Sequence, residues 1–371
     1  MSDDQHAWIR VDLEAIRKNV ARIREHVGSG VDIMSVVKAN AYGHGLVAAG
    51  CAALEGGAAC LGVANAHEGL QLRDAGVREP ILILGPSLPE VVPSVIAAGI
   101  SLTVSSPAHV QAAEDAAKRG GAVAKLHVKL ESGMGRIGAY AAEARPLTET
   151  IRLSPHLELE GLATHVGWDA EQQDRIHPQI KQFKEEVQSL SANACRWTHA
   201  ANSLVTALAP AGHCNLVRAG LLTYGIAPTT SILPPSIDQI TPALSIHARI
   251  TQMRPLKQGQ TVSYSGTYVA PKDQRVGLVP VGYGDGYPRF PVESTPYVLL
   301  KGQRCRILGV VCMDQFVIEL DDRDANIGDE VVLLGASETE SISANDLALL
   351  AAKIPYEIVT GLSARLPYRY A

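Results

Sequence analysis

Short apolar runs alternate with longer amphipathic stretches from residue 31 to about residue 220. Amphipathic stretches such as Ala66–Asp74 and Ala108–Arg119 repeat apolar residues every three or four positions, which predicts helices. The apolar runs predict eight buried strands: Asp32–Val37, Ala59–Val63, Pro80–Leu84, Ile100–Val104, Ala124–Leu130, Leu157–Thr164, Cys195–His199 and Asn215–Arg218. Eight strand-then-helix units predict a parallel sheet closed into a (β/α)8 TIM barrel. An open doubly wound sheet has the same alternation and stays open as an alternative here.

The pattern changes after Pro228–Gln239, a segment that is rich in proline and serine and has no helical period. β-branched runs separated by turn residues then predict a mainly antiparallel β domain. These runs are Leu244–Met253, Thr261–Tyr268, Arg275–Val281, Tyr297–Leu300, Cys305–Leu308, Val311–Leu320 and Glu330–Leu334. We therefore expect two domains, residues 1–235 and 236–371. The run Ala7–Val11, which precedes a helix predicted over Leu13–His26, fits either domain.

Reactive side chains follow several predicted strands, at the edge where (β/α)8 barrels build their active sites. Lys38 ends an apolar run and is followed by small residues and a tyrosine. A buried amine has a lowered pKa and can act as a nucleophile or a Schiff-base partner. An isolated lysine at a strand end would more often only reach water. The other polar residues at or just after strand ends are Lys129, Arg136, His165, Asn202 and Arg218.

Two short segments follow the last two predicted strands, where (β/α)8 barrels often bind phosphate. Asn202 and Ser203 have short side chains that can form hydrogen bonds. In the second segment the Arg218 cation is followed by Gly220 and Leu221, and a phosphate can approach the glycine N–H closely. Asn202-Ser203 also fits a helix N-cap. Both interpretations can hold, because the start of a helix also attracts anions.

Gly133–Gly138 matches the dinucleotide fingerprint Gly-x-Gly-x-x-Gly, and Glu158 and Glu160 lie near the offset of a ribose ligand. This motif would indicate an NAD-dependent dehydrogenase. The fingerprint normally opens the first strand–helix–strand unit, whereas this copy follows the fifth predicted strand. We therefore disfavour the dehydrogenase alternative.

Composition indicates an ordinary soluble protein. The 371 residues are 46% hydrophobic and 19% charged, with a net charge of −5. No basic cluster suggests nucleic-acid binding, and no apolar stretch is long enough to span a membrane. The acidic start lacks the features of a signal peptide, and the six cysteines and twelve histidines have no zinc-site spacing. We expect a cytoplasmic protein with reduced thiols and no metal.

Five phrases together resemble the alanine racemases, enzymes of fold-type III that depend on pyridoxal 5′-phosphate. They are VVKANAYGHG (residues 36–45), ESGMGRIG (131–138), VSY (262–264), VPVGYGDGYPR (279–289) and VCMDQ (311–315). The phrases extend across both predicted domains. The resemblance implies interconversion of L-alanine and D-alanine, supplying D-alanine for peptidoglycan.

The resemblance also implies two catalytic bases, one on each face of the substrate Cα. Lys38 would hold the cofactor as a Schiff base and act as one base. Tyr264 would be the other, contributed together with Met313 by the partner subunit of a head-to-tail homodimer. Lysine and tyrosine side chains ordinarily have a pKa of about 10, so both need their surroundings to act near neutral pH.

The remaining roles follow from the same resemblance. Arg218 would bond the pyridine nitrogen with His165 behind it, and Arg136 would contact the cofactor's phenolic oxygen and the substrate carboxylate, which the Met313 amide would also contact. Lys129 would be the position that is carbamylated in many members, facing Arg136. The cofactor-binding set would be Lys38, Tyr42, His165, Asn202, Ser203, Arg218, Gly220, Leu221 and Tyr356, with Asp314 and Tyr283 in support.

Two positions depart from the family pattern. Val310 replaces an arginine that lines the substrate corridor in many members, and Val166-Gly-Trp168-Asp169 replaces a more usual Phe-Ala pair. These changes leave open a racemase of broader specificity, for example for serine. Two other classes stay as alternatives: a fold-type III decarboxylase, which would use a cysteine-centred motif in place of Tyr264, and a cofactor-binding protein without turnover, which would not need the β domain.

Overall fold

A computed structural model describes residues 5–167, 172–190, 195–229 and 233–371. The chain divides into two compact units. One comprises Glu14–Thr241, and the other combines the chain up to Leu13 with Pro242–Ala371. Within the described ranges, no helix is both long and apolar enough to cross a lipid bilayer.

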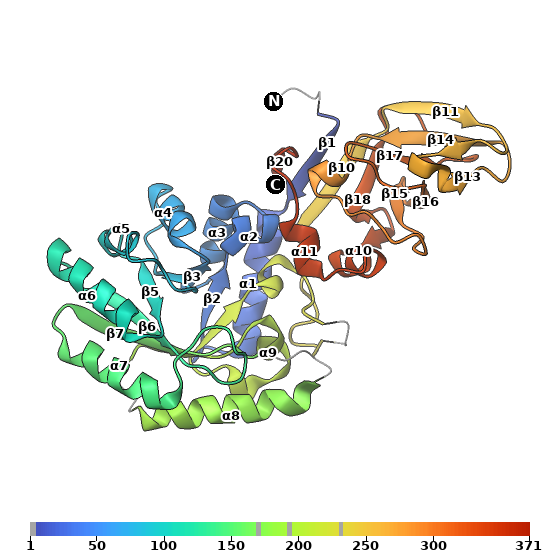
Figure 1. The fold of residues 1–371 in the computed structure, drawn as a ribbon. Helices are drawn as coiled ribbons and strands as arrows, with labels where there is room; N and C mark the ends of the chain where they lie inside the picture. Colours follow the sequence, from blue (N-terminus) through green and yellow to red (C-terminus); the bar gives the residue numbers. More distant parts are fainter. Residues whose placement is uncertain (1–4, 168–171, 191–194, 230–232) are drawn as a thin grey trace. The chain divides into compact units, whose positions relative to one another are not determined.

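The Glu14–Thr241 unit is a parallel barrel (Figure 1). Its strands pair in the order β8-β7-β6-β5-β4-β3-β2-β9, and eight strands are seen in the part of this unit that the structure describes. The Arg218 N–H donates to the Ala201 carbonyl at 3.0 Å, which brings β9 beside the end of β8 and closes the sheet. The strands are β2 (Asp32–Val36), β3 (Cys60–Val63), β4 (Ile81–Ile83), β5 (Ser101–Val104), β6 (Ala124–Lys129), β7 (Leu157–Ala163), β8 (Trp197–His199) and β9 (Leu216–Ala219).

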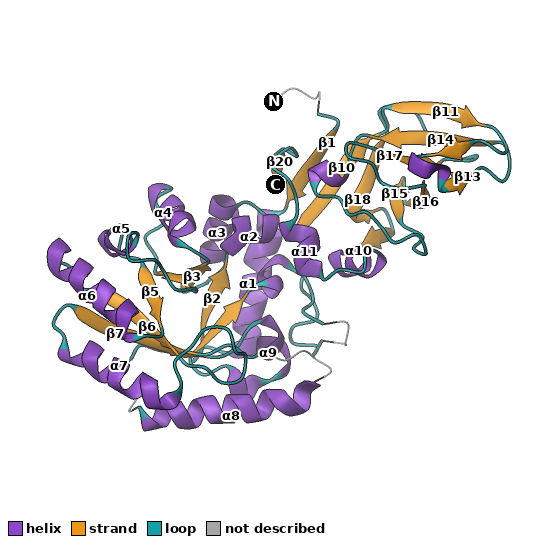
Figure 2. Cartoon of the chain, viewed as in Figure 1, coloured by secondary structure: helices purple, strands orange, loops and turns teal. Residues whose placement is uncertain are grey.

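Helices cover the outside of this barrel (Figure 2). The strands are almost wholly buried because one face packs on these helices and the other fills the barrel interior, where Met34, Cys60, Leu82, Trp197 and Leu216 form a core cluster. The helices are α1 (Leu13–Val27), α3 (Leu46–Glu55), α4 (Ala66–Asp74), α5 (Val92–Ala97), α6 (Pro107–Gly120), α7 (Ala141–Leu153), α8 (Gln173–Ser189) and α9 (Ser203–Leu208).

The other unit is a mainly antiparallel sheet with the strand order β11-β14-β17-β16-β15-β18-β10-β1-β20. The first strand, β1 (Ala7–Val11), pairs with β10 (Leu244–Arg249) and β20 (Tyr368–Tyr370). The other strands are β11 (Gln252–Leu256), β14 (Gln274–Val279), β15 (Tyr297–Leu300), β16 (Gln303–Leu308), β17 (Phe316–Glu319), β18 (Glu330–Ser337) and β19 (Glu340–Ile342). A hairpin of β12 (Thr261–Val262) and β13 (Tyr268–Val269) and the helices α10 (Ala344–Leu350) and α11 (Pro355–Thr360) complete the unit.

The predicted fold class is confirmed, and every predicted barrel strand coincides with an observed one. Three predicted β-domain strands are wrong in their extent. Leu244–Met253 covers β10 and only the start of β11, with a break at Ile250 and Thr251. Thr261–Tyr268 is interrupted by a 3₁₀ turn at Tyr264–Gly266, and of Val311–Leu320 only Phe316–Glu319 is strand. In the last two cases alternating apolar residues continue through a turn, so the hydrophobic pattern alone does not reveal the break.

Candidate active site

Lys38 follows β2, where the chain makes a left-handed turn. Ala39, Asn40, Ala41 and Tyr42 all have φ between 52° and 54°. L-residues avoid this region because Cβ approaches the carbonyl oxygen, at a cost of about 1–2 kcal/mol per residue. Four consecutive residues in this conformation store strain that the surroundings must offset, and such strain gathers at functional sites.

Two polar side chains hold the turn from either side. The Ala39 N–H donates to one carboxylate oxygen of Glu68 at 2.7 Å, and the Ala64 N–H, just after β3, donates to the other at 2.7 Å. Asn40 Oδ1 accepts from the Leu46 N–H at 2.8 Å, at the start of α3. The backbone around Lys38 is therefore tied to the next strand and the next helix.

His44 supports the same turn from inside the unit. Its Nδ1 lies 2.8 Å from the Tyr42 carbonyl and 3.1 Å from that of Ala41, so this nitrogen carries the proton. The ring stacks on Tyr224 with centroids 4.3 Å apart. Burial lowers the pKa of His44 to about 4, so the ring stays neutral near neutral pH.

The barrel end around Lys38 is strongly cationic. Burial lowers the pKa of Lys129 to about 7, with the positive charges of Arg218, Arg136 and Lys38 adding to the effect. Burial followed by Arg136 also lowers the pKa of Lys38, although Glu68 opposes this shift. These four cations repel one another electrostatically, so an anionic ligand would relieve the repulsion.

Arg218 is buried and held by five hydrogen bonds. Its Nη1 donates to His199 Nδ1 at 2.8 Å and to the His199 carbonyl at 2.9 Å. Its Nη2 donates to the Thr164 and Ala200 carbonyls at 2.9 and 3.0 Å and to His165 Nδ1 at 3.3 Å. Burial lowers the pKa of Arg218 to about 10, so it remains a cation. Burial and the Arg218 charge lower the pKa of His165 to about 2, so His165 is neutral.

A polar cradle lies at the start of α9. Ser203 Oγ accepts from the Gly220 N–H at 2.9 Å and from the Leu222 N–H at 3.4 Å. A Cβ at Gly220 would lie 2.6 Å from the Tyr42 hydroxyl, so only glycine fits there. The Asn202 side chain caps α9, which confirms the N-cap interpretation.

The glycine loop Gly133–Gly138 binds a carboxylate of its own chain. Glu131 Oε1 accepts from the Gly133 N–H at 2.6 Å and the Met134 N–H at 2.7 Å. The next helix, α7, begins only at Ala141. The fingerprint requires a helix directly after the loop and free N–H groups for a pyrophosphate. The dinucleotide alternative is therefore wrong.

Gln179 of α8 links two loops of the candidate site. Its Nε2 donates to Ser132 Oγ at 3.0 Å and to the His165 carbonyl at 3.1 Å. Ser132 also shares a hydrogen bond of 2.5 Å with the Thr164 hydroxyl. The loop that carries Arg136 is thereby fixed to the strand end that carries His165.

In the other unit, Tyr264 lies in a strained turn and its side chain is 74% exposed. Ser263 has φ 69° and ψ −178°, and Ser265 has φ 61°. The torsions of Ser263 belong to a region used almost only by glycine, at a cost of about 1–3 kcal/mol. Ser263 Oγ donates to the Val310 carbonyl at 2.8 Å, which holds the turn in place.

A second turn in this unit supports Met313, whose side chain is also exposed. The Gly284 N–H donates to the Met313 carbonyl at 2.9 Å. Arg365 bridges two carboxylates, with Nη2 2.8 Å from Asp314 and Nε 3.3 Å from Asp285. The segment Val311–Gln315 is thus fixed by Gly284, which lies in the phrase at residues 279–289, and by Arg365, which the sequence analysis did not single out.

The expected site residues separate between the units. The barrel unit contains Lys38, Tyr42, Lys129, Arg136, His165, Asn202, Ser203, Arg218, Gly220 and Leu221, and the other contains Tyr264, Tyr283, Met313, Asp314 and Tyr356. Trp168 lies outside the described residues. Sequence reasoning missed His199, Glu68, Gln179 and Arg365. For His199 a signal existed, since a histidine stands at the end of a buried strand.

Comparisons with known proteins place both units in one family. A family model described as the alanine racemase N-terminal domain matches residues 11–228, and one for the C-terminal domain matches residues 243–370. The alanine racemase of Symbiobacterium thermophilum is 38% identical over 98% of this chain and 96% of its own length. Alanine racemase 1 of Bacillus subtilis is 36% identical over 97% and 92%. The crystal structure of alanine racemase from Streptomyces lavendulae superposes with a TM-score of 0.91 and 32% identity, covering 100% of this chain and 98% of that one.

Proposed function

The chain belongs to the alanine racemase family, and we propose from this premise that it interconverts L-alanine and D-alanine with pyridoxal 5′-phosphate as cofactor. The activity makes it an isomerase. The observation that carries this function is the match to alanine racemases over almost the whole chain, covering both units. Relatives named for alanine do not favour the broader-specificity alternative.

The barrel residues fit this cofactor. Lys38 offers an amine whose pKa is lowered by burial and by Arg136, which leaves more of it in the nucleophilic form. The Ser203 hydroxyl, the Gly220 and Leu222 N–H groups and the Tyr42 hydroxyl, which lies close to the Gly220 backbone, gather at the start of α9, and hydrogen-bonding groups of this kind suit a phosphate. Arg218 presents a fixed cation for the ring nitrogen. When bound, the cofactor withdraws electrons from the substrate Cα and acidifies its C–H bond.

Two bases then move the proton. Lys38 would take or return it on one face of Cα, and Tyr264 of a partner subunit would act on the other. L-alanine and D-alanine have equal free energies in water, so a base on each face serves both directions. The exposed side chains of Tyr264 and Met313 support a role at the site of a second subunit, in a head-to-tail homodimer.

Lys129 and Arg136 would orient the substrate carboxylate. With a pKa of about 7, the Lys129 amine is neutral in a large fraction of molecules near pH 7. Its nitrogen can then bond to the carbon of carbon dioxide and release one proton to solvent, which gives an anionic carbamate. The negative carbamate would pair with Arg136 and remove one of the four repelling cations. Carbon-13 bicarbonate should then give a protein-bound carbamate NMR signal that Lys129→Ala abolishes.

Racemisation is tested by incubating the cofactor-loaded protein with L-alanine in deuterated water. Optical rotation should decay to zero while deuterium enters Cα, since each turnover exchanges the proton with solvent-derived groups. Lys38→Ala and Tyr264→Phe should each lower the rate by at least about 100-fold, as expected when an acid–base group is lost.

Lys181→Ala serves as the matched control. Lys181 is an exposed lysine of α8 with a side chain 79% accessible, and its removal should leave the rate unchanged. Loss of rotation in the Lys38→Ala variant at the normal rate would contradict the assignment of Lys38. Absence of exchange in the unaltered protein with alanine, serine or lysine would refute a racemase altogether.

A further inference from the structure

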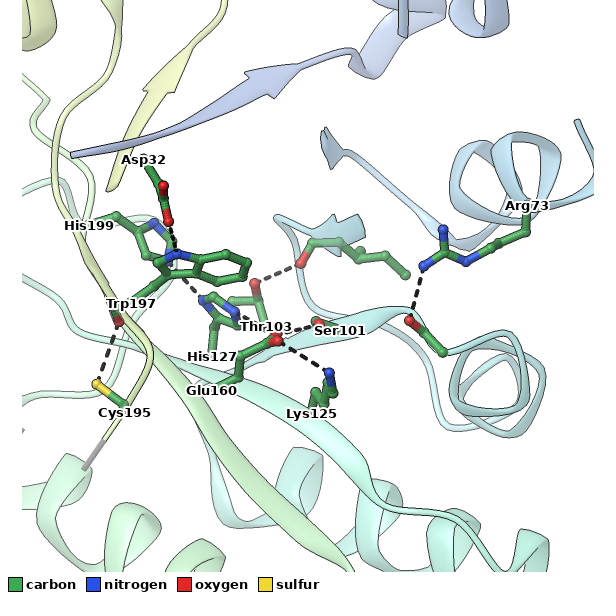
Figure 3. Close-up of polar contacts among 12 residues, drawn as sticks. Asp32, Arg73, Ser101, Thr103, Lys125, His127, Glu160, Cys195, Trp197 and His199 are labelled. Carbon is green, nitrogen blue, oxygen red and sulfur yellow. Dashed lines mark hydrogen bonds and ion pairs between the residues drawn. The ribbon is translucent and has the colours of Figure 1, made fainter. Parts of the chain in front are cut away.

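Four polar side chains form a continuous network inside the barrel, behind Arg218. They come from neighbouring strands: Ser101 from β5, His127 from β6, Glu160 from β7 and His199 from β8. Each is at most 3% exposed. Figure 3 shows His199, His127 and Glu160 joined in succession, with Ser101 and Lys125 at the Glu160 end.

The direction of every hydrogen bond in this network is determined by its two ends. Arg218 can only donate, so His199 Nδ1 accepts and the His199 proton lies on Nε2. That nitrogen is 2.8 Å from His127 Nδ1, which must therefore accept. The His127 proton then lies on Nε2 and is donated at 3.1 Å to Glu160 Oε2. These hydrogen bonds connect the Arg218 cation to the Glu160 carboxylate, and each of them has one donor and one acceptor.

A charged His127 would break this arrangement. Protonated His127 would donate from Nδ1 to His199, which would force the His199 proton onto Nδ1, facing the Arg218 donor. Two donors would then oppose each other in a buried space. The hydrogen-bond directions therefore require a neutral His127. Burial lowers the pKa of His199 well below its ordinary value, so the His199 ring is neutral as well. The group that carries negative charge is Glu160; burial would raise its pKa, but the hydrogen bonds of His127 and Ser101 bring it below the usual value.

The backbone is adapted to place these side chains. The pairing of β6 with β7 passes from Leu126–Leu159 to His127–Gly161, so Glu160 is an extra residue in β7. Such a bulge redirects a side chain. Gly161 makes room for the neighbouring ring, since a Cβ there would lie 2.3 Å from His127 Nδ1.

Stability alone does not explain the network. Barrel interiors are ordinarily filled with branched apolar side chains. Burying a carboxylate and two imidazoles costs desolvation energy that well-packed apolar residues would avoid. Within the described residues, Glu160 forms one ion pair with a lysine: the Lys125 Nζ lies 3.7 Å from Oε1.

We propose that Glu160, His127 and His199 are positioning residues that fix the His199 tautomer and supply a remote counter-charge, so that Arg218 stays an oriented hydrogen-bond donor. This inference rests on the proposed function, in which Arg218 contacts the ring nitrogen of the cofactor. A donor held in this way cannot accept a proton from that nitrogen or shift to deliver one, which keeps the electronic state of the bound cofactor constant during turnover.

The test combines ring NMR with kinetics on full-length protein loaded with pyridoxal 5′-phosphate. Nitrogen-15 labelling of histidine should show His127 and His199 both neutral and protonated on Nε2. Glu160→Leu removes the acceptor and should change both ring signals. Glu160→Gln keeps an acceptor but loses the charge, so it should keep the tautomers. We expect kcat to fall about 10- to 100-fold in Glu160→Leu, the size of effect seen when a residue that orients a ligand-binding side chain is lost. The fall should be smaller in Glu160→Gln, and KM should be nearly constant in both variants.

Glu158→Gln is the matched control, because Glu158 is an exposed glutamate two residues earlier in the same strand. It should behave as the unaltered protein. The proposal is overturned if His127 is charged, or if folded Glu160→Leu keeps both the ring signals and kcat. Should Glu160→Leu not fold, an unchanged kcat in Glu160→Gln would overturn the counter-charge. Failure of the proposed function would instead be seen in the unaltered protein, as an absence of alanine racemisation.

Discussion

The surroundings of Arg218 fix both the orientation of its guanidinium and its positive charge. Its five hydrogen bonds all go to acceptors, and none of these is a carboxylate. A guanidinium with a pKa of about 10 does not transfer its proton to a pyridine nitrogen near neutral pH. In the proposed complex with the cofactor, Arg218 would leave the ring a weaker electron sink, so negative charge at Cα would be too short-lived for protonation elsewhere. Such a site would favour racemisation over transamination.

Arg218→Glu should therefore change the outcome of the reaction as well as its rate. A carboxyl group can share a proton with the ring nitrogen, which prolongs the life of the charge at Cα. We expect kcat for racemisation to fall by about 100-fold or more, and the fraction of turnovers that release pyruvate to rise. Chromatography of the products measures that fraction. Arg218→Lys, which keeps a cation, should release less pyruvate than Arg218→Glu, and equal fractions in both variants would argue against this account.

His44 makes a residue-scale prediction about stability and pH. Its pKa is about 4 in the folded protein, whereas an unfolded histidine has a pKa of about 6.5. The unfolded state therefore binds the proton first as the pH falls. The stabilisation is complete above about pH 6.5 and is lost progressively down to about pH 4.

His44→Asn should flatten this part of the stability profile, because the amide can still donate to the turn carbonyls but does not titrate. Urea unfolding at several pH values between 4 and 7 measures the slope. The variant should be less stable at pH 7, since it loses the stacking on Tyr224. Exposed His67→Asn is the control, and a slope in His44→Asn as steep as that of this control would contradict the prediction.

At the scale of elements, the hydrophobic pattern was sufficient for the barrel and insufficient for its turns. Each predicted barrel strand was found because burial on both faces gives a continuous apolar run. The left-handed turn after Lys38 and the bulge at Glu160 were not predictable in this way. Both depend on backbone torsions and strand register, which neighbouring strands impose and which leave no periodicity in the sequence.

The same limit applies to the candidate site. Residues at strand ends, such as Lys38 and Arg218, could be selected from the sequence because parallel strands bring their carboxyl ends together. Their partners could not, since His199, His127 and Glu160 meet only through the closed sheet. A residual signal was present, because charged and imidazole side chains interrupt otherwise apolar strands at His127 and Glu160. Such interruptions in a buried strand indicate a network.

The strained turn at Tyr264 can be tested through Ser263, whose hydrogen bond and backbone torsions hold the turn. Ser263→Ala and Ser263→Gly both remove the hydrogen bond to the Val310 carbonyl. Alanine keeps the torsional strain, so it should destabilise the protein by about 1 kcal/mol, whereas glycine relieves the strain and should be close to neutral. Both should lower kcat, because Tyr264 is held less well.

Steady-state kinetics and urea unfolding of the two Ser263 variants separate these effects. The rates should fall together while the stabilities differ. Full kcat in Ser263→Gly would show that the hydrogen bond does not position Tyr264, and equal stability of the two variants would show that the torsions of Ser263 carry no measurable strain.

At the scale of the whole molecule, the two proposed bases belong to different compact units of the chain. Each unit positions its own base by local means: Lys38 by a left-handed turn tied to Glu68, and Tyr264 by a strained turn tied to Val310. Neither unit contains both groups, and Tyr264 is largely exposed in the single chain. This division supports a site that is completed by a second copy, with the symmetry of a closed dimer giving two such sites.

Hybrid dimers test that arrangement directly. Lys38→Ala and Tyr264→Phe chains, carrying different affinity tags, are co-expressed and the mixed dimer is purified through both tags. If each site combines Lys38 of one chain with Tyr264 of the other, one site carries both changes and the other carries none. The hybrid should then recover about half of the wild-type activity per dimer, although each parent alone is nearly inactive. If both bases came from the same chain, every site in the hybrid would lack one of them, and the activity would stay at the level of the parents.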